Sequence, residues 1–265
     1  MICADEKYKD KPLVRILDYI QTLAAQCPRG INYNCTCKMV NAVWNPELEG
    51  DLIPITVVNC SNLELLELPE SLPEHTTTLD ASVNRISSLR PLAVNPDYRN
   101  VADVYVDDND LSSIATLEGA EWLSTFRVLS LRGNRLKQVP TYALDNALSK
   151  NKNVAQLYLG RNPWRCDCVY MPRLQDLLLK YQSIIKDIDQ ITCRYVKGDL
   201  NSNAKIKSLS KSCVCRAEPE KWFRPLDLIN ILLGLSIIFV LLKLAYDYYY
   251  FKKCGRLPWV ITKLP

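Results

Sequence analysis

The chain has 265 residues, which is enough for one large domain or two small ones with a substantial apolar core. Its net charge of +4 comes from four basic residues that follow the last acidic one, Asp247, since the first 247 residues carry 29 basic and 29 acidic side chains. This balance argues against a nucleic-acid-binding protein.

Eleven cysteines are many for a cytosolic protein of this size. Ten of them lie before residue 216, mostly in two groups at 27–60 and 166–215, and Cys254 stands apart. Clustered cysteines in even number indicate disulfides and an oxidising compartment. Two sequons in the first group predict glycosylation on a secretory route, at Asn34 and Asn59.

The N-terminal segment, residues 1–26, carries apolar residues at helical spacing. These residues predict a short amphipathic helix, and they are Leu13, Ile16, Leu17, Ile20 and Leu23. The pattern assigns no function to this segment.

Residues 27–62 contain the first cysteine group. Two apolar runs within it, 38–44 and 53–60, predict a β-hairpin. Its four cysteines can form two bridges with three possible connectivities, and they are Cys27, Cys35, Cys37 and Cys60. Zinc is the alternative interpretation of each Cys-X-Cys pattern. The spacing is shorter than usual for zinc, however, and the only histidine, His75, lies outside both groups.

Residues 63–163 contain the clearest pattern in the chain, a short segment that recurs four times. The copies follow an apolar-x-x-Leu-x-Leu-x-x-Asn-x-Leu pattern and occupy 76–86, 101–111, 126–136 and 154–164. The asparagines Asn84, Asn109 and Asn134 are 25 residues apart, and Asn162 follows after 28.

This pattern resembles the leucine-rich repeat family. The resemblance implies an α/β solenoid, a short horseshoe with a parallel β-sheet on its concave face. The spacing has a physical reason, because Leu129 and Leu131 alternate with exposed positions on one face of a strand too short to bury that face alone. Neighbouring strands must therefore stack, and we expect the repeated asparagines to bond backbone groups of adjacent repeats as structural residues.

A stack of four repeats leaves apolar surface open at both ends, so it needs caps. Residues 164–215 match the C-terminal cap of extracellular leucine-rich repeat proteins, with Trp164 expected to pack on the last turn. Apolar residues at helical spacing predict a covering helix, and they are Leu174, Leu177, Leu178, Tyr181, Ile184 and Ile185.

The family resemblance also implies the pairing within this cap, Cys166 with Cys193 and Cys168 with Cys213. Residues 27–62 correspond to the N-terminal cap of the same family. Cys3 and Cys215 remain outside both caps, where they could pair with each other or with another chain.

On the implied horseshoe, exposed strand positions line up in columns across the concave face. The columns are acidic in the first two repeats and carry arginines in the last two. Tyrosine and arginine are enriched at binding hot spots. The predicted partner-binding residues are Tyr105, Asp107, Asp108, Arg132, Tyr158 and Arg161. The alternative is that these charges neutralise one another on a solvated face without a partner.

Residues 226–250 predict a transmembrane helix, preceded by a juxtamembrane segment at 216–225 and followed by a cytoplasmic tail at 251–265. Its uncharged run, 228–242, spans about 22 Å as a helix, shorter than the ~30 Å hydrocarbon core, so the span must continue through Lys243 and Asp247. These two residues are four apart and can pair. A buried core helix is the alternative interpretation.

The four basic residues after the span place the tail in the cytoplasm by the positive-inside rule. We therefore expect a single-pass type I protein of the plasma membrane with an extracellular ectodomain. Residues 1–26 carry too many charges for a secretory leader, so we expect the sequence to be a fragment or to begin at a mispredicted start.

No catalytic, cofactor or metal motif accompanies these elements, and His75 stands in a polar stretch without a nucleophile motif, so we expect no enzyme, cofactor or metal site. The predicted function is ectodomain binding of a protein ligand or co-receptor, without an intrinsic signalling domain. The alternative is an accessory subunit that assembles through a span containing Asn230, Lys243 and Asp247.

The whole arrangement, with a Pro-Trp-Val tail, resembles the insect singed wings (halfway) group. That resemblance implies a developmental role at the cell surface. It leaves the ligand and the oligomeric state open.

Overall fold

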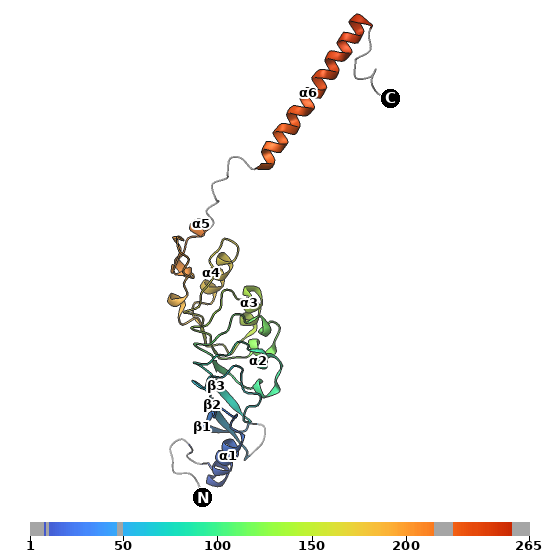
Figure 1. Cartoon of the computed structure of the whole chain (residues 1–265). Coiled ribbons are helices and arrows are strands. Elements are labelled where there is room, and N and C mark those ends of the chain that lie inside the picture. The colour runs from blue at the N-terminus through green and yellow to red at the C-terminus, as the bar shows by residue number, and fades with distance from the viewer. Residues whose placement is uncertain (1–7, 9–10, 47–49, 215–224, 256–265) are drawn as a thin grey trace. The chain divides into compact units, whose positions relative to one another are not determined.

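The computed structural model describes residue 8 and residues 11–46, 50–214 and 225–255 (Figure 1). It contains two compact units, Met1–Cys215 and Arg216–Pro265, which are described separately. The α-helices are α1 (Leu13–Gln26), α2 (Arg90–Val94), α3 (Thr141–Lys150), α4 (Met171–Lys180), α5 (Lys211–Val214) and α6 (Pro225–Cys254). Short 3-10 helices lie at Pro96–Tyr98, Ala115–Leu117, Glu121–Ser124, Ile188–Gln190 and Ile206–Ser208.

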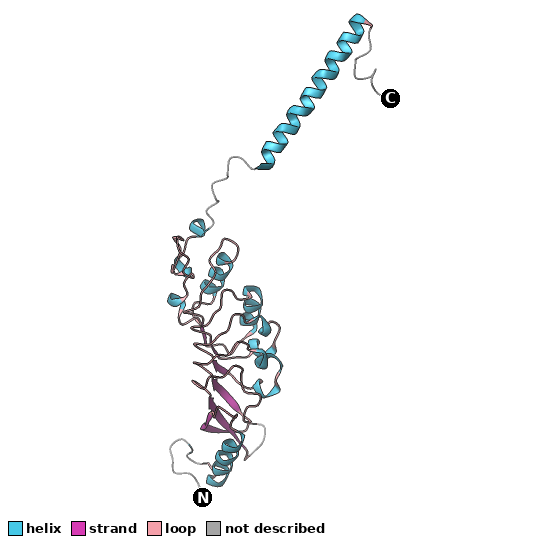
Figure 2. Cartoon of the chain, viewed as in Figure 1, coloured by secondary structure: helices cyan, strands magenta, loops and turns pink. Residues whose placement is uncertain are grey.

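One six-stranded sheet runs through the first unit (Figure 2). Its strands lie side by side in chain order: β1 (Thr36–Trp44), β2 (Leu52–Asn59), β3 (Thr76–Asp80), β4 (Asp103–Tyr105), β5 (Val128–Ser130) and β6 (Gln156–Tyr158). The β1–β2 pair is antiparallel and every later pair is parallel. The predicted hairpin and the predicted parallel stack of one strand per repeat are therefore both confirmed.

The core of the solenoid lies behind this sheet. Strand residues in register, Leu79, Val104, Leu129 and Leu157, are all fully buried. The segments that return from one strand to the next carry α2, α3 and the 3-10 helices Pro96–Tyr98, Ala115–Leu117 and Glu121–Ser124, which cover this apolar side (Figure 2). A three-residue strand cannot exclude water alone, so each repeat depends on its neighbours for its buried surface.

The four repeated asparagines are buried and link adjacent repeats. Asn134 is typical, because its Nδ2 donates to the carbonyl oxygens of Val106 (2.9 Å) and Leu131 (3.1 Å), and its Oδ1 accepts from the Leu111 amide (3.1 Å). Asn84, Asn109 and Asn162 make equivalent bonds. The predicted structural role of these asparagines is confirmed.

The residue before each ladder asparagine adopts a left-handed backbone conformation. These residues are Val83, Asp108, Gly133 and Arg161, with φ between 53° and 63°. The turn brings the asparagine back beneath the strand, where its amide reaches the neighbouring repeat. Glycine suits this geometry, whereas the β-branched Val83 is strained in it.

The N-terminal end of the solenoid is closed by the hairpin and two disulfides. Cys27 bonds to Cys37 and Cys35 bonds to Cys60, so these four cysteines are paired with one another and not arranged around zinc. Helix α1 packs on the far end of the hairpin through Ile16 and Leu23. The amphipathic helix is confirmed, but Leu17 and Ile20 of its predicted apolar face remain exposed because the hairpin offers only a narrow apolar surface.

The C-terminal end is closed by α4, by the buried Trp164 and by a disulfide between Cys166 and Cys193, the pairing that the family resemblance implies. Cys168 is disulfide-bonded as well. Its expected pairing with Cys213, and the fate of Cys3 and Cys215, lie outside the described side chains.

The covering helix α4 is shorter than the spacing of the apolar residues predicts. It ends at Lys180, and Ile185 instead forms an isolated parallel bridge with Leu157 of β6. The helical spacing of the apolar residues predicts too long a helix, because the last strand needs an extended neighbour at its open edge.

The second unit contains α6, whose segment Leu228–Lys253 is long and apolar enough to cross a membrane. Lys243 Nζ lies 2.6 Å from Asp247 Oδ1, as the spacing of four residues predicts. A helix of 26 residues spans about 39 Å, which exceeds the ~30 Å hydrocarbon core. The two charges therefore have room to approach the membrane surface.

We expect Asn134→Ala to lower the free energy of unfolding by about 3 kcal/mol, because it leaves buried backbone groups on two repeats without partners. Urea unfolding of the full chain in detergent measures the change. Asn146→Ala, an exposed position on α3, is the control and should change stability by less than about 0.5 kcal/mol. Equal effects of the two substitutions would contradict the structural role of the ladder.

Val83→Gly should stabilise the protein by about 1 kcal/mol, since it removes left-handed strain from a β-branched residue whose side chain is half exposed. The matched reverse change, Gly133→Val, should destabilise it, because a Cβ there would stand 1.9 Å from Asp108 Oδ1. Thermal melting of both variants measures the effect. A lower melting temperature for Val83→Gly would show that the turn is not strained.

Candidate functional site

The strand register assembles a concave surface from positions that are distant in sequence. One row contains Thr78, Asp103, Val128 and Gln156, and the next contains Asp80, Tyr105, Ser130 and Tyr158. Side chains of residues in register project to the same face of a sheet, so these rows align as expected. Tyr105 and Tyr158 are half-buried within the second row.

Arg132 is held from two sides. Its Nε donates to Asp187 Oδ2 at 3.2 Å, and its guanidinium carbon lies 4.2 Å from the centre of the Tyr158 ring. The Asp187 side chain is only 1% exposed and also accepts from the backbone amides of Leu159 (3.0 Å) and Gly160 (2.7 Å). Arg132 is therefore part of the contact between the last repeat and the C-terminal cap.

Three more of the predicted residues, Asp107, Asp108 and Arg161, are bonded within this surface as well. Asp107 accepts from the Ser130 hydroxyl and from the Arg132 amide, while burial raises the pKa of its carboxyl group above the usual value. Arg161 Nη2 lies 3.1 Å from Asp108 Oδ2, and both side chains are about half exposed.

Arg127 and Asp103 form a further ion pair on this surface. The hydrogen bond to Asp103 raises the pKa of Arg127. Neither Arg127 nor Asp187 was predicted from sequence. Arg127 stands just before a strand, where the repeat pattern specifies no residue, and Asp187 is 55 residues from its partner Arg132.

These pairs leave a concave surface with little uncompensated charge. Five of the six predicted partner-binding residues, namely Asp107, Asp108, Arg132, Tyr158 and Arg161, are bonded within the chain. Two tyrosines and the uncharged strand positions remain as contact surface. Their role in partner binding stays a prediction.

The hairpin extends this surface toward the N-terminal cap. Val57 of β2 is in register with Thr78 of β3, and Val43 of β1 stands opposite Ile53. Ile53, Ile55 and Val57 are partly exposed on the same face, while the alternating residues of β2 are buried. Sequence reasoning missed this apolar area because β2 is apolar on both faces, a pattern that does not reveal which face is exposed.

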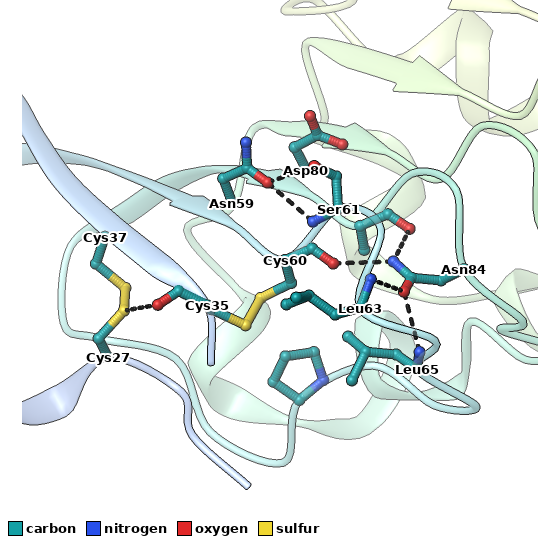
Figure 3. Close-up of a disulfide and its surroundings, with 12 residues drawn as sticks. Cys27, Cys35, Cys37, Asn59, Cys60, Ser61, Leu63, Leu65, Asp80 and Asn84 are labelled. Carbon is teal, nitrogen blue, oxygen red and sulfur yellow. Dashed lines mark hydrogen bonds between the residues drawn. A yellow bond between two sulfur atoms is a disulfide. The ribbon is translucent and has the colours of Figure 1, made fainter. Parts of the chain in front are cut away.

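The two predicted glycosylation sites lie within the N-terminal cap. Asn34 is exposed and forms an isolated antiparallel bridge with Arg29. Asn59 is the exposed last residue of β2, in register with Asp80 (Figure 3).

His75, the only histidine, occupies a turn with a φ of 61°, and its Nε2 lies 3.7 Å from Glu74 Oε1. It shares a cavity of about 180 Å³ with residues of α1 and the hairpin. Among the residues that the structure describes, no three histidine, cysteine or acidic side chains gather as metal ligands do.

The chain is similar to the singed wings 2 and halfway proteins and to leucine-rich repeat proteins. The Halfway C-terminal domain family matches residues 226–263, which include most of α6. Protein singed wings 2 of Drosophila melanogaster is 41% identical over 268 residues, covering 100% of this chain and 53% of that protein. Protein halfway of the same species is 33% identical over 261 residues, covering 97% and 41%.

The first of these relatives is thus about twice as long as this chain, and the second is longer still. Among solved structures, the Toll–Spatzle complex of Drosophila contains a chain with a similar fold, with a TM-score of 0.51 and 20% sequence identity. The match covers 81% of this chain and 25% of that one.

Asp187→Ala should lower the free energy of unfolding by about 3 kcal/mol, because two buried backbone amides and Arg132 lose their acceptor. Asp189→Ala is the matched control two residues away, where the carboxylate is 57% exposed and pairs with Lys205 and Lys207 on the surface. The effect of Asp189→Ala should be much smaller, because a solvent-exposed ion pair contributes little to stability. Equal costs, measured by urea unfolding, would refute the anchoring role of Asp187.

Proposed function

Since the chain is a leucine-rich repeat protein homologous to singed wings 2 and halfway, we propose that it is a cell-surface protein whose ectodomain binds another protein. The proposed binding site is the concave face of β2 to β6. Binding there would serve a receptor, co-receptor or adhesion role, with the ectodomain outside the plasma membrane and α6 as a single span.

The concave face supports this proposal most directly. It offers Tyr105 and Tyr158 in one row, and the partly exposed apolar residues of β2 continue the surface. Aromatic and apolar side chains between neutralised charges form an area that loses little hydration energy when covered. A partner with a matching apolar or aromatic contact therefore fits better than a strongly charged one.

One comparison supports protein binding, and the charge at the end of α6 supports the proposed orientation. The similar solved structure is a complex of Toll with Spatzle, so a related fold binds a protein in that case. The last turn of α6 is basic, with Lys252 and Lys253, in agreement with a cytoplasmic C-terminal side.

A second candidate function rests on the span itself. The Halfway C-terminal domain match covers α6 and most of the tail, whereas an anchor needs only apolar residues of sufficient length. The span also contains Asn230 and the Lys243–Asp247 ion pair. Such groups are favoured where one transmembrane helix contacts another, so the chain would then act as an accessory subunit of a channel or receptor.

We expect Tyr105→Ala together with Tyr158→Ala to weaken partner capture by the full-length protein at least about tenfold, because hot-spot aromatic residues contribute about 2 kcal/mol each. Proximity labelling on intact cells, with a peroxidase fused to the N-terminus, would identify the neighbours. Tyr142→Ala, an 86% exposed position on α3, is the control. Neighbours recovered equally with all three proteins would exclude the concave face.

The double substitution Lys243→Leu and Asp247→Leu separates the two functions. The accessory function predicts loss of co-purifying membrane proteins in mild detergent while the neighbours that depend on the concave face are retained. The receptor function predicts no change in the co-purifying membrane proteins or in the neighbours that depend on the concave face. Epitope tags at the two ends give the orientation, with the N-terminal tag detected on intact cells and the C-terminal tag only after permeabilisation.

A further inference from the structure

Asn59 occupies a place on the concave face that the repeat pattern does not reveal. It ends β2, opposite Thr36 of β1 and Asp80 of β3. Because Asp80 begins the row that continues through Tyr105, Asn59 extends this row by one strand. In Figure 3 the side chains of Asn59 and Asp80 project to the same side of the sheet, away from the ladder residue Asn84.

The amide of Asn59 is oriented by its own sequon. Its Oδ1 accepts from the Ser61 amide at 2.8 Å and from the Ser61 hydroxyl at 2.7 Å. Within the described part of the chain, no hydrogen bond uses its Nδ2. The residue is exposed, so this nitrogen faces the solvent above the concave surface.

We propose that Asn59 carries an N-linked glycan that covers the N-terminal end of the concave face and directs partner contact toward β4 to β6. This inference rests on the proposed function, which places the ectodomain on the secretory side. In the modification, Asn59 Nδ2 forms a bond to the anomeric carbon of a lipid-pyrophosphate-linked oligosaccharide. The lipid pyrophosphate leaves, and the amide nitrogen gives up one proton.

The strand spacing determines what the glycan covers. Neighbouring strands lie about 4.8 Å apart, so Asp80 stands about 5 Å from the attachment point and Tyr158 about 19 Å, four strands away. The apolar area of β2 includes Val57, two residues before Asn59 on the same face. A glycan at Asn59 therefore covers this area and Asp80 first, and Tyr158 least.

The other sequon provides an internal control. Asn34 lies before β1, outside the rows formed by the parallel strands, and is also exposed. It belongs to the same cap and would meet the same enzymes. A glycan on Asn34 reports the orientation of the chain without covering Asp80, the residue of β3 in the second row.

The test uses the full-length protein made in insect cells. Site-resolved mass spectrometry of the intact and glycosidase-treated protein should find glycans at both asparagines. A cysteine introduced by Asp80→Cys should react several-fold more slowly with a polyethylene glycol maleimide than the same cysteine in a background with Asn59→Gln. Ser61→Ala removes the sequon while keeping Asn59, and should restore the fast reaction equally.

Two controls are needed to interpret the rates of the maleimide reaction. The reaction of Tyr142→Cys on α3 should not depend on Asn59, and the parent protein gives the background from its own cysteines. An unmodified Asn59 beside a modified Asn34 would overturn the inference and leave the orientation intact. Two unmodified asparagines would overturn the orientation as well, and equal Asp80→Cys rates with and without the glycan would refute the covering.

A separate observation carries a second inference. The middle residues of the two sequons, Cys35 and Cys60, are bonded to each other. Both are buried, and their amides donate to Pro28 O (3.0 Å) and Asp80 O (2.7 Å). Closing this bridge therefore ties the middle residue of each sequon into the fold.

We infer that glycosylation competes with closure of this bridge. Closure oxidises the two thiols, which pass two electrons and two protons to an oxidised thiol–disulfide exchange protein of the secretory compartment. Wild-type protein should therefore show incomplete glycosylation. Replacing Cys35 and Cys60 with Ser should raise occupancy of both asparagines, whereas Cys166→Ser with Cys193→Ser should not. Complete occupancy in the wild type, or an equal rise in both double variants, would overturn the competition.

Discussion

The buried asparagine ladder is the interaction on which the rest of this structure depends. Strands of three residues bury too little apolar surface to be stable singly, and their loops leave backbone groups that water cannot reach. Each ladder amide, such as that of Asn109, bonds the backbone of its own repeat and of the preceding one. The stack therefore gains both buried surface and satisfied polar groups only when neighbours are present, and this is why both ends need caps.

The same ladder fixes what the concave face can offer a partner. It requires a left-handed residue in each repeat, and Asp108 and Arg161 occupy that position in the second and fourth repeats. Those two residues pair across the face, while Arg132 is bonded to the C-terminal cap through Asp187. The arginines and aspartates thus stabilise the solenoid, and the tyrosines and apolar strand positions remain as the proposed contact surface.

The N-terminal cap joins stability to the proposed regulation of that surface. The Cys35–Cys60 bridge closes the core and lies between two asparagines of glycosylation sequons, so covalent closure and proposed modification act on the same few residues. The hairpin that this bridge supports also carries the apolar area next to Asn59. The repeat pattern requires the N-terminal cap only to cover the end of the stack, but this cap is also part of the concave face.

The sequence by itself determined the repeats, the structural asparagines, the hairpin, the pairing of Lys243 with Asp247 and the length of the span, because each follows from local periodicity or spacing. It also indicated both cysteine groups, but not which of three connectivities the first one adopts. Only the tertiary structure decided that Asp187 anchors Arg132, that α4 ends before Ile185, and that Asn59 joins the concave row. These facts depend on residues brought together by the stacking of distant segments, and no local pattern in the chain encodes such contacts.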